Sequence, residues 1–240
     1  IEDLTFKEDR EKKKELFEKL EFVSFLRKLS QENSSEDAGE SETNEENIKK
    51  DIIIQIADKD IKLDFKNSAL HIECYTEDYQ NSDVLGVSVY VDDIAYIFSE
   101  ENFFDNKYVI EYLESEEEKI VYDIKKIIYL AKKNNQEING EIFDIKIANY
   151  LIDVTAKSEI DKIVFNYLGE IISSDEEIYG KGAKRSLPTS DVLNPYIAKI
   201  AASIFEIKPL MIKKLEEENM LDLYKNIEIK VARVLANMEF

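Results

Sequence analysis

The chain has 240 residues, 44% of them hydrophobic, which is enough to form a sizeable buried core. Its net charge of −20 opposes a broad grip on a phosphate backbone, because such binding draws on Lys and Arg side chains that neutralise phosphates. A single cysteine and a single histidine exclude an internal disulfide and a zinc site built from His and Cys ligands. No apolar run approaches the roughly 18 residues that span a bilayer, and no signal-peptide pattern opens the chain, so we expect a soluble, intracellular protein without a membrane segment.

Two segments of different character come first. Residues 3–30 predict a helix, because apolar residues recur at spacings of three and four beside a charged face. Residues 31–47 combine strong negative charge with almost no apolar residues, which predicts a disordered acidic linker. The sequence therefore indicates a domain boundary there, followed by a folded domain that begins at residue 48.

Short runs of β type follow this linker. They read DIIIQIA, LHIECYT, LGVSVYV and DIAYIFS. Only a tight acidic turn at Asp92 and Asp93 separates the last two runs. We therefore predict an antiparallel β-meander.

The hydrophobic period changes after the fourth run. FFDNKYVIEYL is typical of a helix, KIVY of a short strand, and DIKKIIYLAKKNN of an amphipathic helix. FDIKIANYLID repeats the helical pattern. This order predicts an α/β fold, a ribonuclease-H-like mixed sheet with flanking helices and helical segments at both ends of the chain.

The remainder is predicted to be helical, apart from the loop SSDEEIYGKGAKRSLPTSD. We expect helices over residues 157–168 and 196–205, and two more before residue 240. The helix from Tyr196 has one apolar stripe, which predicts that this face is buried in the core. The stripe consists of Ile197, Ile200, Ala201 and Ile204.

Glu73 and Asp123 are the candidate site residues. Tyr75 follows Glu73 by two positions, and on a strand such residues face the same side about 6.6 Å apart, where a second acid would have made a metal-binding pair. Glu73 is either a residual metal ligand or, as we favour, an acid solvated at the edge of the sheet. Asp123 lies between a strand and a helix, so it is a helix N-cap that could also point into a cleft.

Two other features have ordinary explanations. His71 has no partner in the sequence, so a packed or edge histidine is favoured over a catalytic one. The stretch YGKGAKR, from Tyr179 to Arg185, holds three cations but lacks the spacing of a phosphate-binding loop, and a mobile loop is the favoured interpretation.

Four motifs together support a family assignment. LFEKLEFVSFLRKL precedes the linker, FDIKIANYLID and DEEIYGKGAKRSLP lie in the second half of the chain, and IEIKVARVLANMEF ends it. In this order they resemble the connector from a 5′ nuclease, an FD-x-x-x-A-x-YLL-D helix, a loop of members with a decayed proofreading site, and the helix that opens a polymerase thumb. The family is the 3′–5′ exonuclease-like (DEDD-type) domain of bacterial DNA polymerase I.

In active members of that family, four carboxylates hold two divalent metal ions. The resemblance places the first-strand Asp-x-Glu on Glu73 and Tyr75, and the Asp that opens the central helix on Asp123. The family's Asn four residues before that acid is replaced by Lys119, which would add a like charge.

The last family acid lies in a Tyr-x-x-x-Asp helix. Here the two positions fall on Ile197 and Ala201, or, after a shift of one residue, on Tyr196 and Ile200. Neither register restores an acid.

Charge repulsion decides what such a site can do. Two dications about 3.8 Å apart repel by about 15 to 20 kcal/mol at an effective dielectric near 20, which four carboxylates can offset and two are not expected to. We therefore expect vestigial positions without catalytic role, and neither metal nor cofactor in this segment, with Mg²⁺ confined to the parent polymerase domain. These positions are Glu73, Tyr75, Asp123, Ile197 and Ala201.

The resemblance implies a catalytically inactive exonuclease-like domain over residues 48–208, in a DNA-directed DNA polymerase I that acts in replication and repair. Residues 1–30 would be the connector and residues 209–240 the first helices of a truncated thumb. The implied partner is the polymerase domain of the same chain, with DNA bound through the intact polymerase, in a monomer of the bacterial cytoplasm that associates with the nucleoid.

Two other functions stay open. An active metal-dependent exonuclease could recruit Glu77 or Asp78 from the turn beside Glu73. A free-standing interaction module would fit the acidity of the chain but not its motifs.

Overall fold

The computed structural model describes residues 52–240. The predicted helix over residues 3–30 and the predicted acidic linker over residues 31–47 lie outside the described part.

A six-stranded mixed sheet forms the centre of this part, with the strand order β1-β4-β3-β2-β5-β6. Pairing of β2 with β3 and of β3 with β4 is antiparallel, whereas β1 with β4, β2 with β5 and β5 with β6 are parallel. The strands are β1 (Ile53–Ile56), β2 (Ala69–Cys74), β3 (Val84–Val91), β4 (Ile94–Phe98), β5 (Lys119–Val121) and β6 (Ile142–Asp144).

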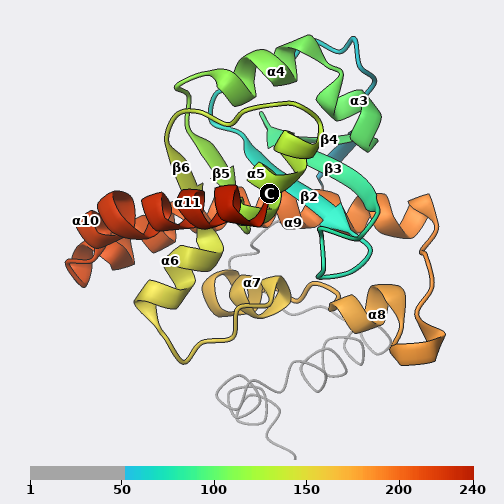
Figure 1. Cartoon of the computed structure of the whole chain (residues 1–240). Helices are drawn as coiled ribbons and strands as arrows, with labels where there is room; N and C mark the ends of the chain where they lie inside the picture. Colours follow the sequence, from blue (N-terminus) through green and yellow to red (C-terminus); the bar gives the residue numbers. More distant parts are fainter. Residues whose placement is uncertain (1–51) are drawn as a thin grey trace, which may run out of the picture. The chain divides into compact units, whose positions relative to one another are not determined.

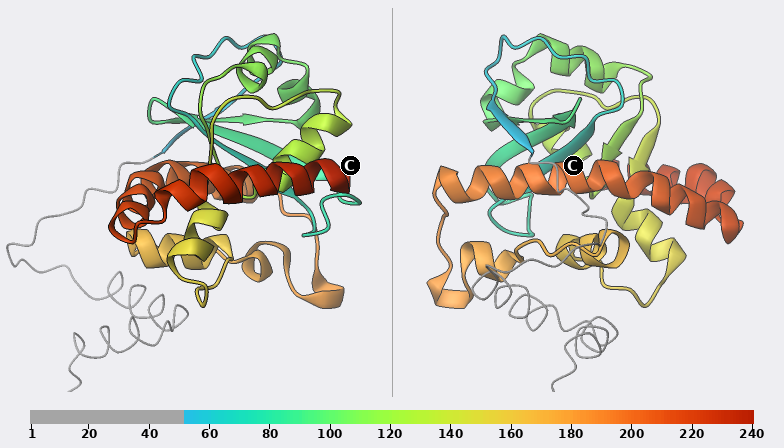
Figure 2. Two further views of the ribbon diagram at one scale, coloured as in Figure 1. Left: turned by 60° about the vertical axis from the view of Figure 1, so that its left-hand side comes forward. Right: turned by 180° about the vertical axis from the view of Figure 1, so that it is seen from behind.

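Helices cover the sheet on both faces. The long helix α9 packs against β1 to β5 on one face, while α5 lies on the other face and carries α11 on its outer side (Figures 1 and 2). The helices are α3 (Glu100–Phe104), α4 (Lys107–Glu114), α5 (Ile124–Lys133), α6 (Ile145–Ile152), α7 (Ile160–Leu168), α8 (Asp175–Tyr179), α9 (Ser190–Glu217), α10 (Leu221–Leu223) and α11 (Ile229–Glu239). A 3-10 turn, η1 (Gly182–Lys184), follows α8, and a π-helical turn, η2 (Tyr224–Glu228), joins α10 to α11.

The predicted α/β class and the mixed sheet are confirmed, but the predicted meander is wrong for its first run. β2, β3 and β4 form the meander, whereas β1 lies at the edge and runs parallel to β4. The twelve residues between β1 and β2 return the chain across the sheet, so β1 does not neighbour β2.

Three helical predictions also need correction. The segment FFDNKYVIEYL forms two short helices, because Asn106 caps the second one and accepts hydrogen bonds from the backbone N–H of Tyr108 and Val109. FDIKIANYLID begins as strand β6, so the sequence prediction missed one strand. The predicted helix over residues 196–205 is part of the longer α9, which continues through Pro209 to Glu217.

Gly86 sets how closely α9 approaches the sheet. A Cβ atom at this position would lie 3.0 Å from Cδ1 of Ile197. The absence of a side chain therefore lets α9 pack directly over β3.

No helix in residues 52–240 combines the length and apolarity that crossing a membrane requires.

Candidate functional site

A cavity of about 820 Å³ opens beside β2, at the N-terminal end of α5. Six parts of the chain border it, and charged and phenolic side chains dominate the border. The side chains include His71, Glu73 and Glu77 from β2 and its turn, Tyr122, Asp123, Lys125 and Lys126 at the start of α5, Lys146 from α6, Asp161 and Lys162 from α7, Asp175 and Glu176 from α8, and Tyr196 from α9.

Glu73 is buried and fully engaged in hydrogen bonds. His71 and Glu73 are two residues apart on β2, so their side chains share a face, and Nε2 of His71 lies 2.7 Å from Oε2 of Glu73. The hydroxyl of Tyr179 donates to Oε1 of Glu73 at 2.7 Å. The predicted solvated edge acid is therefore wrong, because β2 lies inside the sheet between β3 and β5 and Glu73 is only 9% exposed.

Burial decides the charge state of this pair. It lowers the pKa of His71, whose Nδ1 atom is buried without a hydrogen-bond partner, so the ring is neutral and donates from Nε2. Burial opposes the charge of Glu73, but the hydrogen bonds from His71 and Tyr179 and the positive charge of Lys126 hold its pKa below the ordinary value. Glu73 is thus a carboxylate whose two oxygens already have donors.

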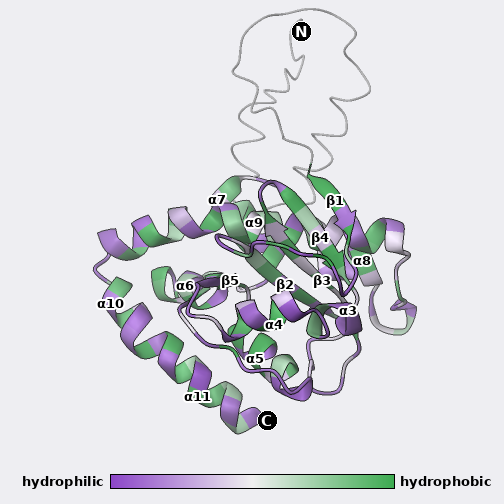
Figure 3. Cartoon of the chain, turned by 90° about the horizontal axis from the view of Figure 1, so that it is seen from above, coloured by the Kyte–Doolittle hydropathy of each residue, from purple (hydrophilic) through white to green (hydrophobic). Residues whose placement is uncertain are grey.

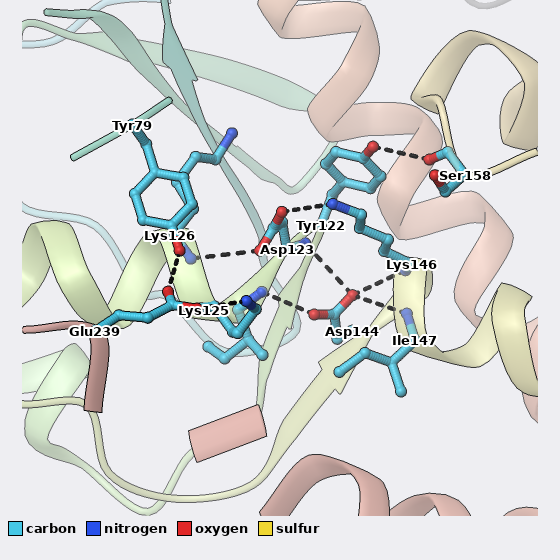
Figure 4. A network of polar contacts seen from close by, with 11 residues as sticks. Tyr79, Tyr122, Asp123, Lys125, Lys126, Asp144, Lys146, Ile147, Ser158 and Glu239 are labelled. Carbon is cyan, nitrogen blue, oxygen red and sulfur yellow. Dashed lines mark hydrogen bonds and ion pairs between the residues drawn. The ribbon is translucent and has the colours of Figure 1, made fainter. Parts of the chain in front are cut away.

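Asp123 caps α5, as the sequence predicts. Its backbone has a φ of 64°, and its side chain accepts a hydrogen bond from the backbone N–H of Lys126. The ammonium of Lys146 lies 2.7 Å from Oδ2 of Asp123 (Figure 4). Burial opposes ionisation of this carboxyl, but Lys146 and Lys126 hold its pKa below the ordinary value.

Asp144 is a second structural acid, which the sequence analysis did not single out. It caps α6 through the backbone N–H groups of Lys146 and Ile147, and its other oxygen accepts from the N–H of Ile124 at 2.7 Å (Figure 4). Complete burial raises the pKa of Asp144 to about 6 against these backbone donors. Its position directly after an apolar run and before a helix was the available signal for an N-cap.

The family model for the ribonuclease H-like domain of DNA polymerase I matches residues 70–207, which is more than half of the chain. The chain belongs to this DNA polymerase I domain family. The matched residues contain β2 apart from Ala69, the whole of β3 to β6 and the whole cavity border, so the family match and the site cover the same part of the fold.

Two curated members of the family extend the match to nearly the whole chain. DNA polymerase I of Bacillus subtilis (strain 168) is 28% identical over 233 residues, which cover 96% of this chain and 26% of that protein. DNA polymerase I of Geobacillus stearothermophilus is 29% identical over 243 residues, which cover 100% of this chain and 27% of that protein. The chain thus spans about a quarter of the length of the curated relatives that it matches.

Solved structures support the fold. Brucella melitensis NrnC superposes with a TM-score of 0.65 at 15% identity, over 78% of this chain and 93% of that one. The POL domain of Pol1 from M. smegmatis, in complex with DNA primer-template and dNTP, gives a TM-score of 0.57 at 15% identity, over 72% of this chain and 28% of that one.

The DNA polymerase I resemblance paired Glu73 with Tyr75, but the structure pairs Glu73 with His71. Tyr75 does not border the cavity, and its ring packs edge-on against Tyr179, with centroids 5.9 Å apart. The guanidinium of Arg185 covers the Tyr75 ring at 5.1 Å. Where β2 meets the cavity, Glu73 is therefore accompanied by His71 and not by Tyr75.

Lys119 was expected to add a positive charge to the site, but it does not border the cavity. Its ammonium donates to the carbonyl of Ser115 and lies 5.0 Å from the Tyr112 ring centroid. Burial lowers the pKa of Lys119 to about 8.

The late helix is apolar where the family has its last acid. Ile197 and Ala201 are both fully buried, which confirms the predicted core face. Of the two registers, the one through Tyr196 meets the cavity, because Tyr196 lies on its border and Ile197 faces Gly86. The residue one turn further in that register is Ile200, also fully buried.

The cationic stretch from Tyr179 to Arg185 is held against the sheet. Tyr179 is 1% exposed, and Arg185 forms an ion pair with Asp175 and donates to the carbonyl of Tyr75. Lys181 pairs with Glu176 at 2.8 Å. Two of its three cations therefore already have protein partners.

The two acids considered for a rearranged site differ in position. Glu77 borders the cavity, whereas Asp78 does not and instead accepts a hydrogen bond from the Asn81 side chain at 3.0 Å. Within residues 52–240, no three His, Cys, Asp or Glu side chains are grouped so that they could hold a metal ion.

Proposed function

We propose that this chain is a 3′–5′ exonuclease-like domain that has lost nuclease chemistry and serves as a structural part of a DNA polymerase I acting in replication and repair. The observation that supports this proposal most strongly is that both acids expected at the site, Glu73 and Asp123, are already bound by groups of the protein.

The ammonium of Lys146 occupies the position beside Asp123 where a metal ion would need to bind. A dication would have to displace this ammonium or bind next to it, and like charges at such short range repel strongly. Displacement would also cost the ion pair, which is partly buried at both ends.

Glu73 offers no better ligand. Its two oxygens accept hydrogen bonds from His71 and Tyr179, and the second first-strand acid expected from the resemblance is replaced by Tyr75, which does not border the cavity. The last family acid is replaced by Ile200 or Ala201, both without exposed surface. The residues of the cavity therefore do not fit a two-metal centre, which requires several carboxylates to hold two cations close together.

The alternative is an active metal-dependent exonuclease with a rearranged carboxylate site. Glu77 favours it, because this acid borders the same cavity as Glu73 and Asp123. In that case Mg²⁺ or Mn²⁺ would have to recruit Glu77 and expel Lys146.

A trimming assay separates the two functions. With Mg²⁺ or Mn²⁺ and a single-stranded oligonucleotide, we expect no shortening from the 3′ end above a control without protein. Shortening that Glu77→Gln and Asp123→Asn abolish, while Asp78→Asn leaves it unchanged, would establish the active alternative.

We further propose that the partner of this domain is the polymerase domain of a longer chain, as in the relatives that are named DNA polymerase I. Because this chain has a net charge of −20, DNA would be held by that polymerase and not by this domain. The working unit would be a monomer in the bacterial cytoplasm near the nucleoid. Gel-filtration and oligonucleotide-binding measurements on the 240-residue chain are expected to give a monomer with no detectable binding in physiological salt.

A further inference from the structure

Helix α11 packs against α5 through an unusually small apolar face. Its buried residues are Ile229, Ala232 and Ala236, of which two have only a methyl side chain. Apolar contact stabilises in proportion to buried area, so this face alone orients α11 weakly. Figure 3 shows hydrophobic and hydrophilic residues alternating along the rest of the helix.

Hydrogen bonds hold this helix at its start and in its middle, where the small apolar face alone would hold it weakly. The Tyr224 hydroxyl, in the π-helical turn before α11, accepts from the backbone N–H of Asp144 at 2.6 Å and lies 3.2 Å from the Asp144 carbonyl. Arg233 donates to the carbonyls of Ile138 and Gly140.

A third set of polar contacts lies at the end of α11, on the rim of the cavity. Oε1 of Glu239 is 2.6 Å from the ammonium of Lys125, and the Tyr79 hydroxyl donates to Oε2 of the same carboxylate (Figure 4). Both partners border the cavity, one from the turn after β2 and the other from the first turn of α5. Residues 79, 125 and 239 are far apart in sequence, so only the folded chain brings them together.

Aromatic contacts surround this ion pair. The ring of Tyr129 lies between those of Tyr79 and Phe240, with both centroid distances 5.6 Å, and the ammonium of Lys132 lies 5.6 Å from the Phe240 centroid. These rings partly shield the ion pair, and its side chains are 37% and 27% exposed. Such shielding strengthens the interaction relative to a fully solvated pair.

We propose that Tyr79 and Lys125 form a seat for the Glu239 carboxylate, so that two residues on the rim of the cavity fix the position of α11 near residue 239. The seat sets which way α11 faces, including its outward residues Val231, Val234 and Met238, all of which are exposed. This inference rests on the proposed supporting role of the domain, and it does not depend on whether nuclease activity has been lost.

Neighbouring lysines give a matched test. Lys125 and Lys126 lie in the same first turn of α5, but only Lys125 contacts Glu239. In the 240-residue chain, Lys125→Ala and Tyr79→Phe are each expected to raise deuterium exchange of the backbone amides near residue 239 by about twofold to fivefold, as loss of a partly exposed ion pair would. Lys126→Ala is expected to leave this exchange unchanged.

Charge reversal tests the seat directly. Lys125→Glu is expected to raise exchange further, and adding Glu239→Lys is expected to restore most of the protection because the pair is re-formed with opposite polarity.

A double-mutant cycle measured by urea unfolding gives a second test. The cycle on residues 125 and 239 is expected to give a coupling of about threefold in the unfolding constant, whereas the cycle on residues 126 and 239 is expected to give no coupling.

Equal amide exchange near residue 239 in Lys125→Ala and Lys126→Ala would overturn the seat. The same holds if adding Glu239→Lys to Lys125→Glu does not restore the protection from exchange. Where exchange at the helix end is too fast to compare, the urea cycle decides. Neither measurement responds to nuclease activity, whereas the trimming assay does not respond to the position of α11, so failure of this inference and failure of the proposed function are distinguishable.

Discussion

The two acids of the site differ in how far along the chain their partners lie: the backbone N–H that Asp123 caps is three residues on, whereas the Tyr179 hydroxyl that binds Glu73 is 106 residues on. Asp123 was recognised as an N-cap because the cap and the helix that it opens are adjacent in sequence. Glu73 was misplaced at a solvated edge because its burial depends on β5 and on Tyr179, which come much later in the chain. The i, i+2 spacing of His71 and Glu73 predicts that their side chains share a strand face. The resemblance instead selects Tyr75, which has the same spacing from Glu73 on its other side.

His71 makes a clean titration probe, because it is the single histidine of the chain. Burial lowers its pKa below 6.5, whereas the unfolded chain takes up the proton near 6.5. Its contribution to stability is therefore complete above pH 6.5 and is lost as the pH falls below it, with a slope of up to about 1.4 kcal/mol per pH unit. The imidazole NMR signals of the folded protein are expected to titrate with a midpoint below 6.5.

The control is His71→Gln, which keeps a donor for Glu73 but cannot titrate. Urea unfolding at pH 7.5 and 5.5 is expected to show a smaller loss of stability on acidification in this variant. The comparison with the variant is needed because Asp144, whose pKa burial raises to about 6, has the opposite effect: its contribution to stability is lost as the pH rises from about 4 to about 6. An imidazole that titrates near pH 6.5 in the folded protein would contradict the assignment.

Secondary-structure elements were predicted best where one hydrophobic period ran without interruption. α5 was correct because its amphipathic pattern and its closing lysines are local signals. α9 is longer than the predicted helix over residues 196–205 and passes through Pro209, although proline in a helix interior costs about 3 kcal/mol. Fully buried Ile207, Met211 and Leu215 lie on either side of this proline, and their burial outweighs that cost.

The contact between α9 and β3 can be tested at Gly86. Gly86→Ala is expected to destabilise the protein by about 1 to 2 kcal/mol, because the new methyl group would approach Cδ1 of the fully buried Ile197 to 3.0 Å. Ile197→Val removes that carbon at a cost of about 0.5 to 1.5 kcal/mol. In urea unfolding, the double variant is expected to lose less stability than the sum of the two single variants; strictly additive losses would mean that the two residues do not collide.

For the molecule as a whole, charge is the dominant global property. A net charge of −20 on 240 residues places many carboxylates within the range of their mutual repulsion. The sequence predicted this property fully, since it depends on composition alone. It could not predict which carboxylates would find internal cations, because pairs such as Lys146 with Asp123 arise only from the fold.

Salt dependence tests both the charge and the metal question. Raising NaCl from 10 to 200 mM shortens the screening length from about 30 Å to less than 10 Å, so the Tm is expected to rise by a few degrees.

MgCl₂ at matched ionic strength is expected to give the same Tm as NaCl. A further rise with MgCl₂, at concentrations where CaCl₂ has no such effect, would reveal a specific magnesium site and contradict the proposed loss of metal binding.

The ion pair of Lys146 with Asp123 changes what a surviving acid means in a family alignment. Asp123 has two duties that selection for folding alone would preserve, the cap of α5 and the balance of a partly buried ammonium. A carboxylate retained at this position is therefore not by itself a sign of metal binding. We predict that a family member with a cation two residues after the position of Asp144 uses its helix-opening acid for the scaffold, and that a member with a neutral residue there leaves this acid able to bind a metal ion.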